Sequence, residues 1–274
     1  MSIGVVVIVA GRLDHLRRTL GGLARQTRPP DDVVVVNMDG NGDVTDAVKR
    51  GPVCARTVLL GAGPAKLPLG AARNAGAGAL ATRRLVFLDV DCIPSAGLVD
   101  DYSQLLDRHP HALACGDVRY LRRRWEVEAD EADDRSLGLW SAPHPARPPV
   151  TGGIRLDDHH ELFWSLNFAV GRARWDQFGG FDEGFVGYGG EDTDLALRAR
   201  SLGAPMAWPP GATAFHQWHP PTRHDPARLD EIVRNAHHFH RRWGTWPMVG
   251  WLRELAAAGT LTFDESSGPC VVET

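Results

Sequence analysis

Short apolar runs alternate with helix-like segments along the first hundred residues. Their length and their content of valine, isoleucine and leucine are typical of strands that are buried on both faces. The runs lie at residues 3–10, 31–40, 55–60 and 85–91. Leucines at helical spacing mark residues 12–26, and small residues fill the helix expected at 70–82. This order predicts an α/β fold with a mainly parallel sheet and helices on both faces.

The later part of the chain carries the same signals less regularly. Residues 117–162 are charged and then rich in proline and glycine. They predict a solvated helix followed by a surface loop, or alternatively a mobile active-site loop or binding insert. A strand-like segment, two helix-like segments and a short apolar run follow at 163–171, 172–179, 191–202 and 212–216. From residue 226 we expect two helices before a polar end.

Composition and charge narrow the class of protein. With 274 residues, a hydrophobic fraction of 43% and a charged fraction of 23%, the chain is typical of a globular protein. A net charge of -4 argues against nucleic acid as a partner. The four cysteines are far apart, no apolar run reaches about 20 residues, and the first residues fit a strand better than a signal peptide. We therefore expect a cytoplasmic protein without a transmembrane segment.

Two aspartates one residue apart, Asp89 and Asp91, end the strand expected at 85–91. In open α/β sheets, ligands bind beyond the carboxyl ends of the strands, where Asp39 and Asn41 are also expected. Burying two like charges this close is costly unless a cation compensates them. Carboxylates are ligands of Mg²⁺ and Mn²⁺, so the pair is a candidate metal site. The alternative is an acidic strand end with a helix-capping role.

A second acidic segment follows three glycines, at 187, 189 and 190. Glycine lets the backbone approach a ligand closely. Glu191, Asp192 and Asp194 then occupy the first turn of an expected helix. Acids are favoured there by the helix dipole alone, but a carboxylate that faces a pocket is also a candidate general base.

Histidines are the remaining candidate metal ligands. His216 follows the apolar run at 212–215, so it is expected to end a strand beside the sheet. We prefer it to His219 as a ligand of Mn²⁺, although both remain candidates. The histidines at 237, 238 and 240 are expected to form one polar face of a helix.

Five motifs occur in an order that resembles a known family. They are NMDGN (37–41), LGAARNAG (69–76), FLDVDCIP (87–94), GGFDE with GGEDTD (179–194) and FHQWH (215–219). Over roughly residues 3–220 the chain is similar to nucleotide-sugar-dependent glycosyltransferases of the GT-A fold. The N-terminal half resembles family 2 glycosyltransferases. The GGFDE and GGEDTD segment resembles the C-terminal module of animal beta-1,4-galactosyltransferases and polypeptide N-acetylgalactosaminyltransferases.

The resemblance implies a role for each matching residue. The donor nucleotide is expected to lie against Asn37, Asp39, Arg73, Asn74, Asp89 and Val90. Asp89 and Asp91 are expected to hold Mn²⁺ or Mg²⁺, with His216 completing the metal site. Asp192 is the expected catalytic base. Glu191, Gly190 and Trp164 are expected to bind the acceptor, although core packing is the commoner role of a tryptophan.

The resemblance also implies an activity and a division of the chain. The expected reaction is metal-dependent, inverting transfer of a hexose or N-acetylhexosamine from a UDP-sugar to a hydroxyl. The acceptor would be a carbohydrate, a glycoconjugate or a small molecule. Residues 1–225 form the expected GT-A domain, with a nucleotide-binding half (1–116) and an acceptor-binding half (117–225). Residues 226–274 form a helical C-terminal extension.

Two departures and two alternatives qualify this assignment. Met38 stands where family 2 members have the first of two successive aspartates, and Phe239 replaces the glutamine of the processive synthases, which disfavours a polymerising enzyme. A nucleotidyltransferase is one alternative, but it would carry a lysine-bearing, glycine-rich loop after the first strand, where this chain has only Gly11 and Arg12. The other is a non-catalytic relative that binds glycans or nucleotide sugars.

Overall fold

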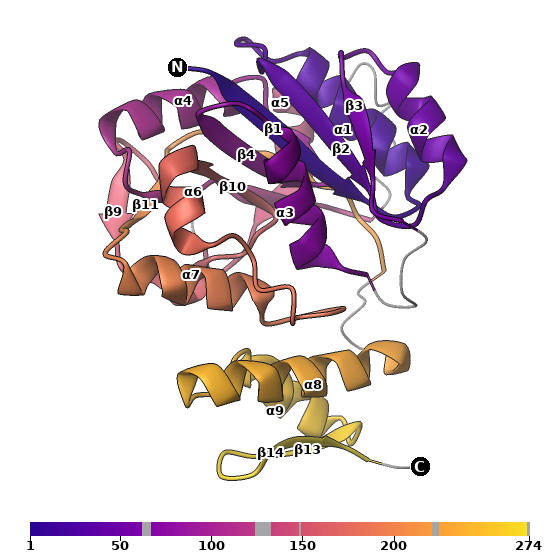
Figure 1. Cartoon of the computed structure of the whole chain (residues 1–274), viewed down its shortest axis with the longest axis vertical. Coiled ribbons are helices and arrows are strands. Elements are labelled where there is room, and N and C mark those ends of the chain that lie inside the picture. Colours follow the sequence, from indigo (N-terminus) through magenta and orange to yellow (C-terminus); the bar gives the residue numbers. More distant parts are fainter. Residues whose placement is uncertain (62–66, 124–132, 148, 221–224, 273–274) are drawn as a thin grey trace.

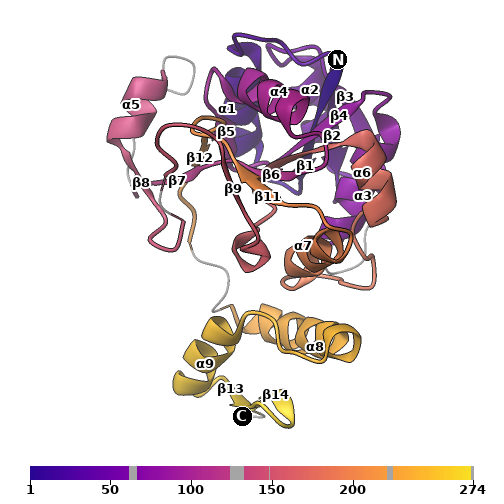
Figure 2. The same cartoon turned by 90° about the vertical axis from the view of Figure 1, so that its left-hand side faces the viewer.

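The structure is a computed structural model that describes residues 1–61, 67–123, 133–147, 149–220 and 225–272. Its centre is an eight-stranded sheet in the order β3-β2-β1-β4-β10-β6-β11-β9, with helices on both faces (Figure 1). A four-stranded sheet lies beside it, and a C-terminal module follows (Figure 2). The expected α/β fold is confirmed.

The first half of the chain supplies the parallel part of the large sheet. Its elements are β1 (Ile3–Val9), α1 (Leu13–Ala24), β2 (Asp32–Asn37), α2 (Gly42–Lys49), β3 (Arg56–Leu59), α3 (Leu69–Ala79) and β4 (Arg84–Asp89). β1 pairs in parallel with both β2 and β4, and β2 pairs in parallel with β3. The four strands and two helices expected here are confirmed. α2 is an additional helix that the sequence pattern did not indicate.

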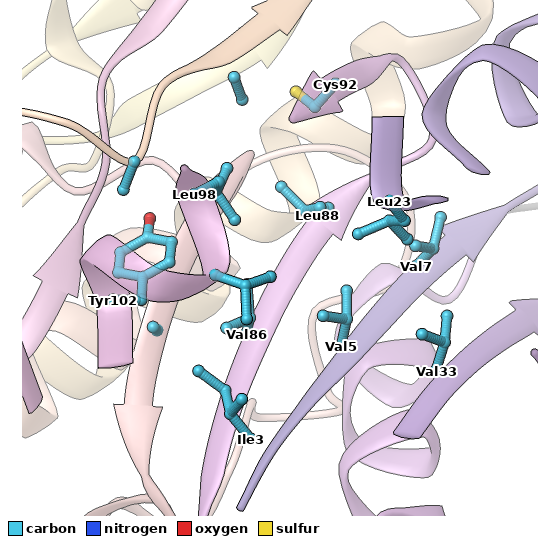
Figure 3. Close-up of a cluster of buried hydrophobic side chains, with 14 of the residues drawn as sticks. Ile3, Val5, Val7, Leu23, Val33, Val86, Leu88, Cys92, Leu98 and Tyr102 are labelled. Atoms are coloured by element: carbon cyan, nitrogen blue, oxygen red, sulfur yellow. The ribbon is translucent and has the colours of Figure 1, made fainter. Parts of the chain in front are cut away.

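Alternate side chains of β1 enter two separate cores. Val5 and Val7 pack with Leu23 of α1 on one face of the sheet, where α4 (Leu98–Arg108) also lies (Figure 3). Val6 and Ile8 pack on the other face, which is covered by α3, α6 (Arg172–Phe178) and α7 (Glu191–Ser201). Because both faces are covered, every residue of β1 is buried, and the strand is apolar throughout.

The second half of the large sheet contains strands of both directions. It contains β6 (Leu113–Cys115), β9 (Arg155–Asp157), β10 (Asn167–Gly171) and β11 (Met206–Trp208). β10 is antiparallel to both β4 and β6, and β9 is antiparallel to β11. β11 is parallel to β6, so both strands run in the same direction as the first four, and only β9 and β10 are reversed. The expected mainly parallel sheet is therefore confirmed, with two reversed strands. A buried strand has the same apolar pattern in either direction, so the pattern alone did not reveal the reversal.

The four-stranded sheet continues directly from the end of β4. Its order is β5 (Cys92–Pro94), β12 (Ala214–His216), β7 (Val118–Leu121) and β8 (Ser141–Pro143). β12 is antiparallel to β5, with His216 opposite Cys92. This register brings the end of β12 beside the turn at Asp91, so His216 ends a strand next to the large sheet, as expected.

The middle of the chain is more ordered than the sequence indicates. The prolines and glycines after residue 140 predict a surface loop, but this stretch begins with β8 of the four-stranded sheet. α5 (Asp134–Leu139) precedes it, and the short 3₁₀ helix His160–Leu162 follows β9. Most of the solvated helix expected from the charged residues falls at 124–132, outside the described residues.

The C-terminal module contains α8 (Pro226–Trp243), α9 (Val249–Ala257), β13 (Leu261–Asp264) and β14 (Gly268–Val271). The two helices were expected, and the hairpin of β13 and β14 was not. Ile232, Leu252, Leu255 and Leu261 are among the residues of its own small core. α8 lies nearest to the main body, below α7 (Figure 1). No described helix combines the length and the apolar character that a membrane crossing requires.

Candidate active site

One carboxylate and two imidazoles meet where β4 ends. Asp91 lies two residues after the end of β4, His216 ends β12, and His219 lies three residues later. His216 Nε2 is 3.7 Å from Asp91 Oδ1, and His219 Nε2 is 3.4 Å from Asp91 Oδ2. One ligand atom from each of the three residues lies within 4.8 Å of the others. Both candidate histidines therefore flank the second aspartate of the DVD motif.

Asp91 and His216 are in the forms that bind a metal. Burial alone raises the pKa of the Asp91 carboxyl, but His216, His219 and Arg12 outweigh burial and hold this pKa well below its usual range. Burial lowers the pKa of His216, against the opposite effect of Asp91, so its imidazole is neutral at neutral pH. Metal ions need a deprotonated carboxylate and neutral imidazoles.

Arg12 is a site residue that the sequence reasoning did not identify. It lies between β1 and α1 in a left-handed conformation, with φ of 47°, and its guanidinium forms an ion pair with Asp91 Oδ2. Because arginine is always protonated, Arg12 keeps Asp91 anionic even when both imidazoles are neutral. The sequence signal that could have identified Arg12 is a basic residue just after the carboxyl end of a central strand.

Asp89 is held by a different partner. Its Oδ1 accepts a hydrogen bond of 2.8 Å from Arg73 Nη2, and it is not a member of the three-residue group around Asp91. Arg73 comes from α3, is only 2% exposed and has its guanidinium 5.1 Å from the ring centre of Phe181. Burial raises the pKa of Asp89, and the nearby Arg73 opposes this rise.

Arg73 also links β4 to the start of α7. Its Nη1 is 3.7 Å from Glu191 Oε1. Glu191 is 5% exposed, and within the described part of the chain neither its Oε2 nor Arg73 Nη1 has a hydrogen-bond partner. Burial, followed by the charge of Asp192, raises the pKa of Glu191 to about 7. Two buried polar atoms thus remain available for a ligand.

Asp192 is the next residue of α7 and is less buried than Glu191. Its Oδ1 accepts a hydrogen bond of 2.7 Å from its neighbour's backbone, Thr193 N. Burial is the largest influence on its carboxyl, and it raises the pKa of Asp192. A general base with a raised pKa is better matched to neutral pH than an ordinary aspartate.

Asp194 differs from both of its acidic neighbours because it is fully buried. It accepts hydrogen bonds of 2.9 Å from Arg198 Nε and from Trp243 Nε1. With both carboxylate oxygens taken by protein donors, Asp194 has a structural role.

Residues 2–244 match the family described as "Glycosyltransferase like family 2". The chain belongs to this glycosyltransferase family. A validoxylamine A glucosyltransferase of Streptomyces hygroscopicus subsp. limoneus is 28% identical over 265 residues, covering 88% of this chain and 56% of that protein. The chain thus spans just over half the length of this curated relative. A Ruegeria sp. (strain TM1040) protein named ribosomal RNA large subunit methyltransferase H is 32% identical over 124 residues, covering 42% of this chain and 74% of that protein.

Solved glycosyltransferase structures share the fold. The crystal structure of S. aureus TarS 1-349 has a TM-score of 0.62 at 13% identity, covering 88% of this chain and 66% of that one. The crystal structure of GalNAc-T7 with UDP, GalNAc and Mn²⁺ has a TM-score of 0.59 at 13% identity, covering 95% of this chain and 57% of that one. These likenesses support the GT-A fold of this family 2 glycosyltransferase.

Several expected donor contacts have local structural partners in this glycosyltransferase. Asn37 is fully buried, donates to the Asn41 carbonyl at 2.9 Å and accepts from Gly40 N at 3.1 Å. Val90 is buried in the core, and its carbonyl accepts a bond of 2.7 Å from the hydroxyl of Thr19. These bonds occupy the polar groups of Asn37 and the carbonyl of Val90, so they hold the turns around the site.

The other residues expected to bind the donor or the acceptor also have contacts within the protein. Asp39 is exposed at the end of β2 and accepts a bond of 2.7 Å from Gly11 N. Asn74 exchanges bonds with both backbone groups of Phe181, so it holds the segment that precedes α7. Gly190 lies directly before α7 and has a positive φ of 93°. Trp164 is half-buried against Arg147, whose guanidinium lies 4.8 Å from the centre of its ring.

Proposed function

We propose that this family 2 glycosyltransferase transfers a hexose or N-acetylhexosamine from a UDP-sugar to an acceptor hydroxyl, with a divalent metal and with inversion. The observation that carries the proposal is the adjacency of two groups. The first group consists of Asp91, His216 and His219. The second consists of Arg73 and the two carboxylates with which it forms ion pairs, Asp89 and Glu191. The first suits a metal-bound diphosphate, and the second leads to Asp192, the proposed base.

The ligand atoms of Asp91, His216 and His219 fit a divalent cation. One buried carboxylate and two imidazoles suit Mn²⁺ better than Mg²⁺, which prefers an all-oxygen shell. Asp91, His216 and His219 would hold the ion. When bound, the ion stabilises the negative charge that develops on the departing nucleoside diphosphate. The proposal of a UDP donor is also supported by the structural neighbour, which was solved with UDP and Mn²⁺.

The protein's own groups provide orientation and proton transfer. Arg73 is buried and charged, and its Nη1 has no hydrogen-bond partner among the described residues and lies 3.7 Å from Glu191 Oε1, so it is the proposed group that binds a donor or acceptor oxygen. Glu191 Oε2 can bind an acceptor hydroxyl. Asp192 then removes the proton from the hydroxyl as its oxygen attacks the anomeric carbon. One direct displacement inverts the anomeric configuration.

The products of the reaction test this proposal. The protein is incubated with Mn²⁺, a panel of UDP-hexoses and UDP-N-acetylhexosamines, and simple sugar acceptors. The proposal predicts UDP and a glycoside of opposite anomeric configuration, which NMR identifies. A retained configuration refutes the inverting mechanism. Release of pyrophosphate or UMP instead of UDP refutes glycosyl transfer by this site.

A further inference from the structure

Helix α8 runs along the segment that leads into the catalytic helix. This segment, residues 181–194, joins α6 to the first turn of α7. α8 contacts it at Asp182, Val186, Tyr188 and Asp194. The contacts include hydrogen bonds from Asn235 Nδ2 to the carbonyl oxygens of Val186 and Tyr188, at 3.3 and 3.2 Å. Asn235 is fully buried, so these bonds are shielded from water.

The segment needs such support because its own backbone is permissive. Gly187, Gly189 and Gly190 all have positive φ values, of 81°, 98° and 93°. Glycine loses more conformational freedom on folding than any other residue, so three of them define a conformation only weakly. A Cβ at Gly187 would lie 2.3 Å from the side chain of Glu231, whose Oε2 accepts a bond from Tyr188 N at 3.0 Å.

A second connection reaches α7 itself. Trp243, the last residue of α8, donates from Nε1 to Asp194 Oδ1 at 2.9 Å. The guanidinium of Arg242 adds a contact with the same oxygen at 3.4 Å. Asp194 is two residues from Asp192 in the first turn of α7. Its position therefore fixes the turn that carries the proposed base.

We propose that Trp243 and Asn235 are positioning residues of the transfer reaction, and that α8 holds Asp192 in its working position. Asn235 holds the glycine-rich segment before α7, and Trp243 holds the first turn of α7 through Asp194. Neither residue touches the group around Asp91, so α8 acts on proton transfer and not on donor binding. This inference rests on the proposed role of Asp192.

Trp243→Phe is the sharpest test, because phenylalanine keeps an aromatic ring but removes the N–H donor. We expect kcat to fall by about 10- to 100-fold, since small displacements of a catalytic group have effects of this size. The affinity for UDP with Mn²⁺ should stay within about twofold of wild type. Asn235→Ala should likewise lower kcat and leave the affinity for UDP with Mn²⁺ unchanged. Values of kcat are normalised to the number of UDP–Mn²⁺ sites found by calorimetry, so that unfolded protein does not mimic the effect.

Trp246→Phe provides the matched control. It removes the same N–H from the same module, but Trp246 Nε1 donates to the Glu265 carbonyl at 2.8 Å, far along the chain from α7. Its kcat should stay near wild type. If Trp243→Phe and Asn235→Ala keep normal kcat while Asp192→Asn loses it, the inference about α8 is wrong. If Asp192→Asn itself keeps normal kcat, the proposed base is wrong instead. A parallel loss of UDP affinity in the α8 variants also contradicts a role confined to positioning Asp192.

Discussion

Arg73 Nη2 donates a hydrogen bond of 2.8 Å to Asp89 Oδ1, so the two aspartates of the DVD motif have different partners. Asp89 pairs with an arginine, whereas Asp91 faces two histidines. The motif was expected to provide two metal ligands, but only Asp91 belongs to the metal-type group. His216 and His219, which the sequence offered as alternative ligands, both belong to this group.

Loss of either histidine should weaken Mn²⁺ binding. Even outer-shell partners of metal ligands contribute about 10- to 100-fold to affinity, so His216→Ala and His219→Ala should each cost at least about tenfold. The double variant should lose binding altogether. Titration of free Mn²⁺ by EPR measures this, with His159→Ala as a control because that histidine is exposed. If one of the two single variants binds Mn²⁺ normally, that histidine is not a ligand.

Arg12 and a metal ion should compete for Asp91. Both are cations that approach the same carboxylate, and Arg12 contacts it directly. Arg12→Ala should therefore bind free Mn²⁺ about tenfold more tightly than wild type, which corresponds to about 1.4 kcal/mol. Arg17→Ala is the matched control, because Arg17 forms a comparable but exposed ion pair with Asp14. Unchanged or weaker Mn²⁺ binding in Arg12→Ala contradicts the competition.

Much of the fold could be predicted, because buried parallel strands such as β1 are apolar throughout. Shorter elements left weaker signals. β5 has three residues and ends in a proline, and α2 begins at the glycine of an Asn-Gly pair that resembles a turn. The hairpin of β13 and β14 depends on packing within the C-terminal module.

The site could be predicted only where local pattern determined the position of a side chain. Asp91 was identified from a strand end, and His216 from the run before it. Arg12 and Trp243 were missed because their roles depend on partners distant in sequence, Asp91 and Asp194. The local bonds of Asn37 also could not be read from sequence, since a buried asparagine and a nucleotide-binding one look alike there.

Asp192→Asn should separate binding from chemistry. Asparagine can still accept the bond from Thr193 N, so the helix start should persist. Without a base, kcat should fall by about 10²- to 10⁴-fold, with the affinity for UDP unchanged. Steady-state kinetics measures the first effect and calorimetry the second. Glu191→Gln should instead raise the acceptor KM. A near-normal kcat for Asp192→Asn assigns the base to another group.

Glu191 should make stability depend on pH in a defined direction. Its pKa is raised from 4.5 to about 7 in the folded protein. Below pH 4.5 the carboxyl is protonated in both states. As the pH rises from 4.5 to about 7, the carboxyl of the unfolded chain releases its proton first. The free energy of unfolding therefore falls until the carboxyl of the folded protein also ionises near pH 7.

Glu191→Gln removes this dependence. Relative to wild type, the variant should gain on the order of 1–3 kcal/mol of stability between pH 4.5 and pH 8. Urea unfolding at both pH values, with chelator present, measures the gain. Glu161→Gln is the control, because the Glu161 side chain is exposed. An equal pH dependence in wild type and Glu191→Gln would show that Glu191 titrates normally.

The dependence of UDP binding on Asp91 tests the central claim most directly. Calorimetry compares UDP binding with Mn²⁺, UDP binding with chelator, and Asp91→Asn with Mn²⁺. Asp46→Asn serves as control, because its carboxylate is exposed on α2. We expect wild type and Asp46→Asn to bind UDP only with Mn²⁺, and Asp91→Asn not to bind it, because the amide keeps the shape but loses the charge that holds the cation. Wild-type affinity in Asp91→Asn, or equal UDP affinity with chelator, would contradict it.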